Sequence, residues 1–125
     1  MISLAFVEEI HEVLIERFGG MSGIRDRGIL ESAIYRPYQT FDGNDLYPDS
    51  IDKAAAIFES IISNHPFADG NKRTAYVLMR LILMDGKMDL YVSEDEKYNF
   101  VISAAKGELN FGQIRSWIQA NVVAI

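Results

Sequence analysis

The chain of 125 residues contains no cysteine, only two histidines and only three prolines. Without thiols it can form neither a disulfide framework nor a thiolate metal site, and two histidines do not supply the ligand set of a zinc centre. The sequence therefore excludes thiol chemistry and a zinc centre built from cysteine or histidine.

Long hydrophobic runs and an excess of positive charge are absent as well. No apolar segment approaches the roughly 20 residues that span a bilayer, and the N-terminus lacks the basic start and apolar run of a signal peptide. The formal net charge of −6 argues against direct nucleic-acid binding, because contact with a phosphate backbone needs a basic face. We expect a cytoplasmic protein with neither a membrane nor a direct nucleic-acid partner.

The length and the hydrophobic content of 49% predict one domain over residues 1–125. Apolar residues recur at helical spacing along most of the chain, with little strand signal, and capping residues mark the helix starts. Helices are predicted at 3–18, 26–35, 50–64 and 71–84, and two more after Ser93 and Asn110. The turn-rich segment 37–49 predicts a loop or short hairpin. The fold class is thus all-α, a bundle of about six helices.

The most informative segment is 65–74, which reads His-Pro-Phe-Ala-Asp-Gly-Asn-Lys-Arg-Thr directly at the start of the predicted helix 71–84. The first N–H groups of a helix have no intrahelical partner, and the helix dipole makes that end partially positive, so phosphate binds there readily. Gly70 lets the backbone approach a ligand closely, while Lys72 and Arg73 add full positive charge. A polyphosphate is the ligand that this pattern predicts.

Two further side chains complete the predicted chemistry. Asp69 would repel a bare phosphate, so we interpret it as a ligand of Mg²⁺ that bridges phosphate oxygens. His65 is the candidate general base for a substrate hydroxyl, because an imidazole can take up a proton near neutral pH. Each residue alone has an ordinary interpretation as a structural histidine, a turn or capping residue, or a solvated charge. Their combination within nine residues favours function.

The same segment resembles the signature of the Fic/Doc superfamily, whose Fic branch reads H-P-F-x-[DE]-G-N-G-R-x-x-R. Lys72 stands where Fic proteins have glycine, and Tyr76 stands where they have the final arginine. A lysine followed by arginine, here Arg73, is instead what the death-on-curing (Doc) branch carries. Residues 18–47 are also similar to the N-terminal halves of Doc proteins, so the resemblance covers most of the chain and implies a Fic/Doc-like bundle.

The resemblance implies specific roles. His65 would be the base, Asp69 the Mg²⁺ ligand, and the phosphates of ATP would be held by Asn71, Lys72, Arg73 and the amide of Gly70. In the Doc branch it implies transfer of the γ-phosphate rather than of a nucleotidyl group. We attribute this change to the lysine side chain, which occupies space that glycine leaves open.

It also implies a toxin of a toxin–antitoxin pair that phosphorylates a translation protein, elongation factor Tu above all, and so arrests protein synthesis. Two alternatives remain, namely a Fic-type AMP transferase and a binding module that keeps the fold without turnover. No [ST]-x-x-x-E-[GN] string, the inhibitory pattern of many Fic proteins, occurs in the chain. Inhibition is therefore expected from a separate antitoxin, whose flexible tail folds onto the toxin.

Segment 37–49 carries a second hypothesis. In Fic-like proteins the equivalent segment is a flap that holds the target peptide, which implies target contacts for Phe41 and Tyr47; the alternative is an ordinary helix connection. We expect Arg80 to be structural, because it lies about 10 Å along the helix from Arg73, and we expect no catalytic role for His11.

Overall fold

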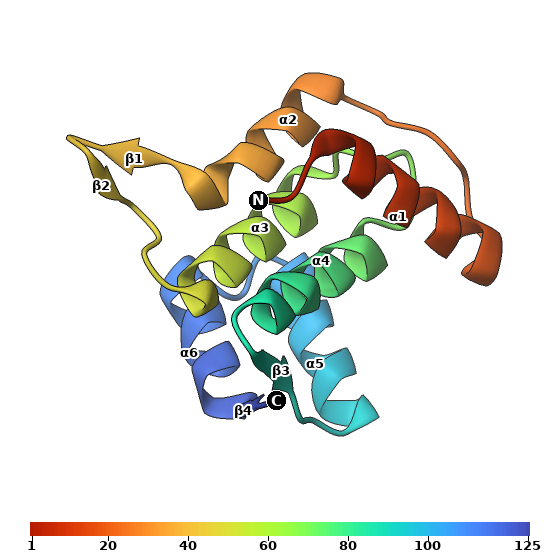
Figure 1. The fold of residues 1–125 in the computed structure, drawn as a ribbon. Coiled ribbons are helices and arrows are strands. Elements are labelled where there is room, and N and C mark those ends of the chain that lie inside the picture. The colour runs from red at the N-terminus through yellow and green to blue at the C-terminus, as the bar shows by residue number, and fades with distance from the viewer.

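The computed structural model describes residues 1–125 and contains six α-helices, which confirms the predicted all-α class (Figure 1). The helices are α1 (Leu4–Phe18), α2 (Arg27–Tyr35), α3 (Ser50–Asn64), α4 (Asn71–Asp85), α5 (Glu94–Ala105) and α6 (Phe111–Asn121). A short 3₁₀ turn, Arg36–Tyr38, extends α2 up to the segment that leads to α3. No helix is long and apolar enough to cross a bilayer.

Five of the six helices begin with a side-chain cap. The spacings of Ser93 with Glu96 and of Asn110 with Gln113 predict capping boxes. The box at Asn110 and Gln113 is complete, but at Ser93 only one half forms, in which the hydroxyl accepts the N–H of Glu96. Ser3 caps α1 in the same way, by accepting the N–H of Phe6. The exception is α4, whose first residues have no capping side chain. The first N–H groups of α4 therefore lack the side-chain acceptor that the other five helices have.

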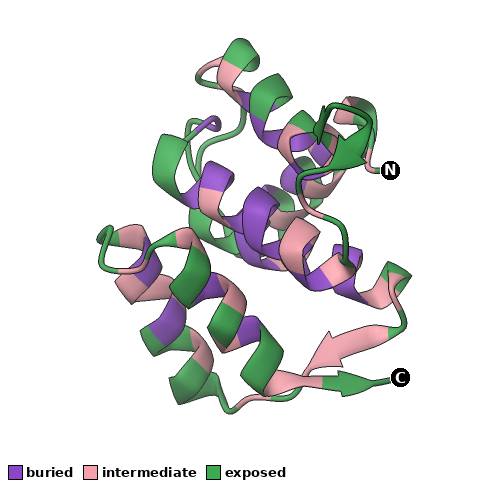
Figure 2. Cartoon of the chain, turned by 90° about the vertical axis from the view of Figure 1, so that its left-hand side faces the viewer, coloured by how far each residue is buried: buried purple, intermediate pink, exposed green.

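Helix α3 lies at the centre of the molecule, and the buried residues gather on it and on its antiparallel neighbour α4 (Figure 2). Three consecutive alanines on α3 let other elements approach closely, and large apolar side chains fill the space around them. Side chains that are completely buried on α3 are Ala54, Ala55, Ala56, Ile57, Phe58, Ile61 and Ile62. Each of the large ones contributes roughly 1.5–3 kcal/mol through burial.

The α3–α4 pair has two ends. At one end the segment 65–70 joins the helices directly. At the other end Gly86 closes α4 beside the start of α3, where a Cβ at residue 86 would overlap the hydroxyl of Ser50. A glycine is therefore needed for this close approach, and the two helices are held together along their full length.

A β-hairpin precedes α3, at the end of the pair that carries Gly86. Strands β1 (Thr40–Phe41) and β2 (Asn44–Asp45) pair antiparallel around the turn residues Asp42 and Gly43, both of which have positive φ, at 53° and 80°. This is the backbone that a two-residue hairpin turn requires. The loop or hairpin predicted for 37–49 is thus a hairpin, and it projects from the left of the molecule in Figure 1.

A second small sheet was not expected from the sequence. Strand β3 (Met88–Leu90) follows α4 and pairs antiparallel with β4 (Val122–Ala124) at the C-terminus. Next to it, Arg80 donates two hydrogen bonds to Asp89, at 3.0 and 2.8 Å, so the structural role predicted for Arg80 is confirmed. This pair lowers the pKa of the Asp89 carboxyl and ties α4 to the sheet.

Candidate active site

His65 ends α3 in the left-handed conformation, with φ 49° and ψ 60°. Glycine or asparagine usually occupies such a position, because a Cβ is strained there. The guanidinium of Arg25 donates to the carbonyls of Asn64 and His65, at 2.8 and 2.6 Å, and so satisfies two acceptors left free at the helix end. The imidazole of His65 is exposed and makes no hydrogen bond within the chain. It is therefore available to a substrate.

Segment 23–26 braces the loop from outside. The backbone N–H groups of Arg25 and Asp26 both donate to the carbonyl of Pro66, at 2.8 and 3.0 Å, and Ala68 donates to Gly23 at 3.0 Å. The sequence had marked this segment only as part of the family resemblance. Its structural role is to hold the loop beside α3. This role depends on backbone hydrogen bonds, which cannot be predicted from a residue pattern.

Asn71 fixes the loop from inside. Its side-chain oxygen accepts the N–H of Phe67 and its amide nitrogen donates to the carbonyl of the same residue, both at 3.0 Å. Phe67 itself is buried in the core. Because both polar atoms of the Asn71 side chain bond to Phe67, only the backbone N–H of Asn71 is left for the predicted contact with phosphate.

Asp69 is held by two backbone donors. Its carboxylate accepts the N–H of Met21 at 3.0 Å and the N–H of Gly70 at 2.8 Å. These bonds, together with nearby Arg73, lower the pKa of Asp69, so the exposed carboxylate stays charged. A Cβ at Gly20 would lie 2.9 Å from the Asp69 Oδ2, so glycine there leaves the carboxylate its space.

No group of three or more acidic or histidine side chains forms a ready cage for a metal ion. A single charged carboxylate such as Asp69 nevertheless suits Mg²⁺, which proteins commonly bind through one or two carboxylates while substrate phosphates and water complete its shell. The residues present therefore fit a magnesium–nucleotide complex better than a free structural metal.

The first turn of α4 is open. Gly70 adopts φ 73° and precedes the helix, and the backbone N–H groups of Asn71, Lys72 and Arg73 have no acceptor in the chain. Neither cation forms a salt bridge; Arg73 instead lies over the ring of Phe18, with 4.6 Å from its Cζ to the ring centre. The free amides and both charges are available to an anion.

These groups line one cleft of about 590 Å³ between the loop, the first turn of α4 and the end of α1. It contains every residue predicted for the chemistry, and Asp69 is its only acidic side chain; the predicted residues are His65, Asp69, Gly70, Asn71, Lys72 and Arg73. A more apolar cavity of about 400 Å³ adjoins it and shares Phe18, Lys72 and Arg73. Tyr76, at the position of the final Fic arginine, lines this second cavity, and burial raises the pKa of its hydroxyl.

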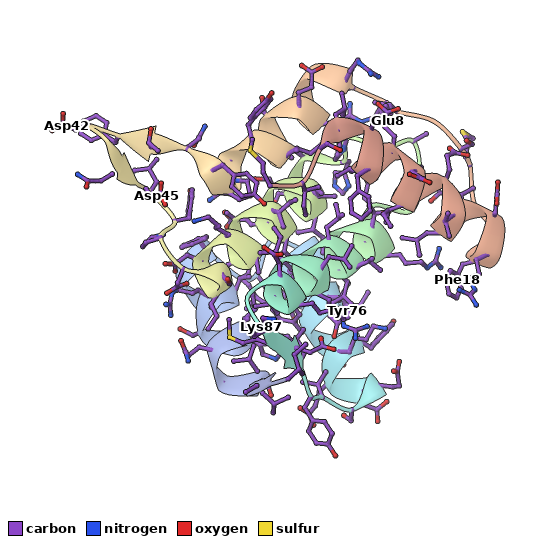
Figure 3. The ribbon with its side chains drawn as sticks, in the orientation of Figure 1. Glu8, Phe18, Asp42, Asp45, Tyr76 and Lys87 are labelled. Carbon is purple, nitrogen blue, oxygen red and sulfur yellow. The ribbon has the colours of Figure 1, made fainter.

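The structure does not bring Phe41 and Tyr47 to this cleft. The hydroxyl of Tyr47 accepts a hydrogen bond from Arg36 at 2.9 Å, and its ring packs edge-on against Phe111. Phe41 is 73% exposed on the hairpin. Figure 3 shows the hairpin residues Asp42 and Asp45 on the opposite side of the molecule from Phe18. A target-holding role for the hairpin stays a prediction.

Comparisons with known proteins agree with the motif. A sequence model described as the Fic/DOC family matches residues 1–83, which is more than half of the chain. "Toxin Doc" of Mycolicibacterium smegmatis is 51% identical over 59 residues, or 47% of this chain and 45% of that protein. "Protein kinase doc" of Escherichia phage P1 is 29% identical over 105 residues, or 84% of this chain and 82% of that protein. The match thus spans less than half of the first relative and most of the second. The chain belongs to the Fic/DOC family.

Proposed function

We propose that this chain is the toxin of a toxin–antitoxin pair and that it transfers the γ-phosphate of ATP to a hydroxyl group of a translation protein. One observation carries the proposal: α4 alone begins without a side-chain cap, and its free amides open into the cleft that holds His65 and Asp69. The likeness to relatives named as a Doc toxin and a Doc protein kinase supports the same conclusion.

The chain's own residues have distinct parts in this reaction. The imidazole of His65 would take the proton of the target hydroxyl as its oxygen bonds to the γ-phosphorus, while the bond to the bridging oxygen breaks and ADP leaves. The amides at the start of α4, with Lys72 and Arg73, would hold the phosphate oxygens in place. Asp69 would hold Mg²⁺, which when bound neutralises phosphate charge.

Lys72 supports γ-phosphate transfer over AMP transfer. It stands where the Fic pattern has glycine, and its ammonium group has no carboxylate partner in the chain. A lysine adds both volume and charge to the first turn of α4. A triphosphate therefore has to bind in a different orientation from the one it can adopt where the helix begins with a glycine at this position. The orientation that presents the γ-phosphate to His65 is the one we propose.

The proposed target is a translation protein, with elongation factor Tu as the first candidate, and the proposed inhibitor is a cognate antitoxin. Both rest on the resemblance to Doc proteins. The hairpin could add a target strand through its main chain, with Phe41 and Tyr47 as neighbouring contacts. Because the hairpin lies far from the cleft, such a target would have to extend along α3. This helix has 15 residues and is about 20 Å long.

The decisive experiment incubates the purified chain with bacterial lysate and ATP labelled on either the α- or the γ-phosphate. We expect γ-label on a band of the size of elongation factor Tu, and we expect His65→Ala to remove it. Tyr91→Ala, a change at an exposed residue outside the cleft, serves as the matched control and should label normally.

Each alternative predicts a different pattern. Label from the α-phosphate would show AMP transfer, and no label from either position, despite binding of ATP, would indicate a module without turnover. Lys72→Gly tests the orientation argument separately: it should shift labelling from the γ- towards the α-phosphate. Unchanged γ-labelling in that variant would contradict the role given to Lys72.

A further inference from the structure

His11 lies beneath the loop that carries the proposed chemistry. It belongs to α1, is 2% exposed, and stacks flat against Phe67, with 3.9 Å between ring centres and 6° between ring planes. Its Nε2 lies 2.8 Å from the carbonyl oxygen of Asp69. Because a carbonyl oxygen can only accept, the proton must reside on Nε2 and the imidazole is the donor.

This hydrogen bond acts on a single peptide unit. The carbonyl of Asp69 and the N–H of Gly70 belong to the same planar group and point in opposite directions. The carbonyl accepts from His11, while the N–H donates to the Asp69 carboxylate at 2.8 Å. Rotation of the peptide would break both bonds, so the donor on α1 fixes the direction in which the carboxylate is held.

Helix α1 also packs closely against the backbone at Gly70, where α4 begins. A Cβ at Gly70 would lie 3.7 Å from the Nε2 of His11 and 3.2 Å from the Cδ1 of Ile15, so α1 forms a floor directly under this backbone. The free amides of α4 follow Gly70 without interruption. Their direction towards the cleft is thus set by the same peptide that His11 holds.

We propose that His11 is a positioning residue whose Nε2–H orients the Asp69–Gly70 peptide, so that the Asp69 carboxylate and the free amides of α4 face one ligand. The inference rests on the proposed function, because it concerns the magnesium–nucleotide complex that the cleft would bind. His11 is not a catalytic residue, since its ring is buried and reaches the cleft only through the backbone of Asp69.

The alternative is that His11 only fills space against Phe67. Two substitutions separate shape from hydrogen bonding. His11→Phe keeps a planar ring for stacking but has no donor, whereas His11→Gln loses the ring and can place an N–H the same number of bonds from Cα. A space-filling role predicts that Phe is the better replacement, and a positioning role predicts that Gln is.

The experiment measures binding of Mg-ATP by calorimetry to the unchanged chain and to both variants, with the melting temperature of each recorded. We expect His11→Phe to weaken binding by about tenfold, the effect of one lost hydrogen bond, and His11→Gln to bind within about threefold of the unchanged chain. Tyr91→Ala is the control and should bind Mg-ATP normally, because Tyr91 is exposed and lies outside the cleft. Equal binding by His11→Phe and the unchanged chain would overturn the inference.

A second readout needs no ligand. In the ligand-free chain the Nε2–H of His11 and the N–H of Gly70 should both exchange slowly with solvent by NMR, and Gly70 should lose protection in His11→Phe but keep it in His11→Gln. Rapid exchange of both protons in the unchanged chain would overturn the inference even if His11→Phe does not fold. If no form binds Mg-ATP but this protection pattern holds, the proposed function fails while the positioning role stands.

Discussion

The two ends of the α3–α4 pair differ in whether their cations have carboxylate partners. At the hairpin end the cations are paired: Lys53 with Asp45 at 3.7 Å, and Arg115 with Asp49 and Asp52. Arg36, at the base of the hairpin, pairs with Glu59 on the side of α3 at 2.8 Å. At the loop end neither Lys72 nor Arg73 meets a carboxylate within salt-bridge distance. The same chain, with a net charge of −6, thus leaves two cations unpaired where the helix amides are also free.

This difference separates stability from function. Paired charges at the hairpin end stabilise the folded state. The unpaired charges and free amides at the loop end contribute little to the free energy of unfolding and remain available to an external anion. Substitutions at the loop end should therefore change ligand binding and turnover with small effects on stability. Substitutions at the hairpin end should do the reverse.

The largest expected effect is on turnover at the loop end. His65→Ala should reduce label transfer by roughly 10²- to 10⁴-fold, the usual contribution of a general base, without lowering the melting temperature. Transfer rates and thermal melts of the same preparation measure both quantities. Retained transfer would remove the role given to His65.

Binding of Mg-ATP gives the next largest effect. At a concentration of 100 times its Kd the ligand should stabilise the fold by about 2.7 kcal/mol, seen as a higher melting temperature. Asp69→Asn should lose the part of this stabilisation that depends on Mg²⁺. Asp45→Asn removes a carboxylate at the hairpin end and should keep it in full. Equal loss in both variants would break the distinction between the two ends.

Stability should respond most at the hairpin end. Arg36→Ala removes hydrogen bonds to Tyr47 and Ser60 and the ion pair with the half-buried Glu59, so we expect a loss of roughly 2 kcal/mol in the free energy of unfolding. Arg73→Ala, the matched change at the loop end, should cost less than about 1 kcal/mol. Urea unfolding measures both, and a reversed order would contradict the comparison.

The smallest effect concerns the Arg80–Asp89 pair, which lies away from both ends. Because the pKa of Asp89 is lower in the folded chain than in the unfolded chain, its contribution is present above the unfolded pKa, about 3.9, and is lost as the pH falls through the folded pKa. Asp89→Asn should cost less than about 1 kcal/mol at pH 6, and this difference should disappear at low pH. A difference that does not shrink as the pH falls below the unfolded pKa of about 3.9 would refute the assignment.

Much of this architecture was predictable from local sequence signals. Helical spacing and capping residues such as Ser3, Ser93 and Asn110 placed the helices, because these signals act within one or two turns. The loop residues from His65 to Arg73 could be named as a candidate site for the same reason, because their chemical groups lie in one continuous segment.

Long-range contacts escaped prediction. The bracing of the loop by Arg25 and the contact of His11 with Asp69 join residues 40 and 58 positions apart, and neither follows from a repeat or a motif. The β3–β4 sheet pairs two three-residue strands, which are too short to show periodicity. The occupied side chain of Asn71 could not be foreseen either, because an amide serves phosphate binding and loop closure equally well.

The left-handed backbone at His65 has a consequence for how inactive forms would arise. At φ 49° a glycine or asparagine suits the backbone at least as well as histidine, so losing the imidazole relieves local strain instead of creating it. In a selection against the proposed toxicity, survivors with Gly or Asn at this position should remain folded and abundant. If the proposed antitoxin exists, such folded but inactive variants should still bind it, and their presence in a cell would alter its regulation without arresting growth.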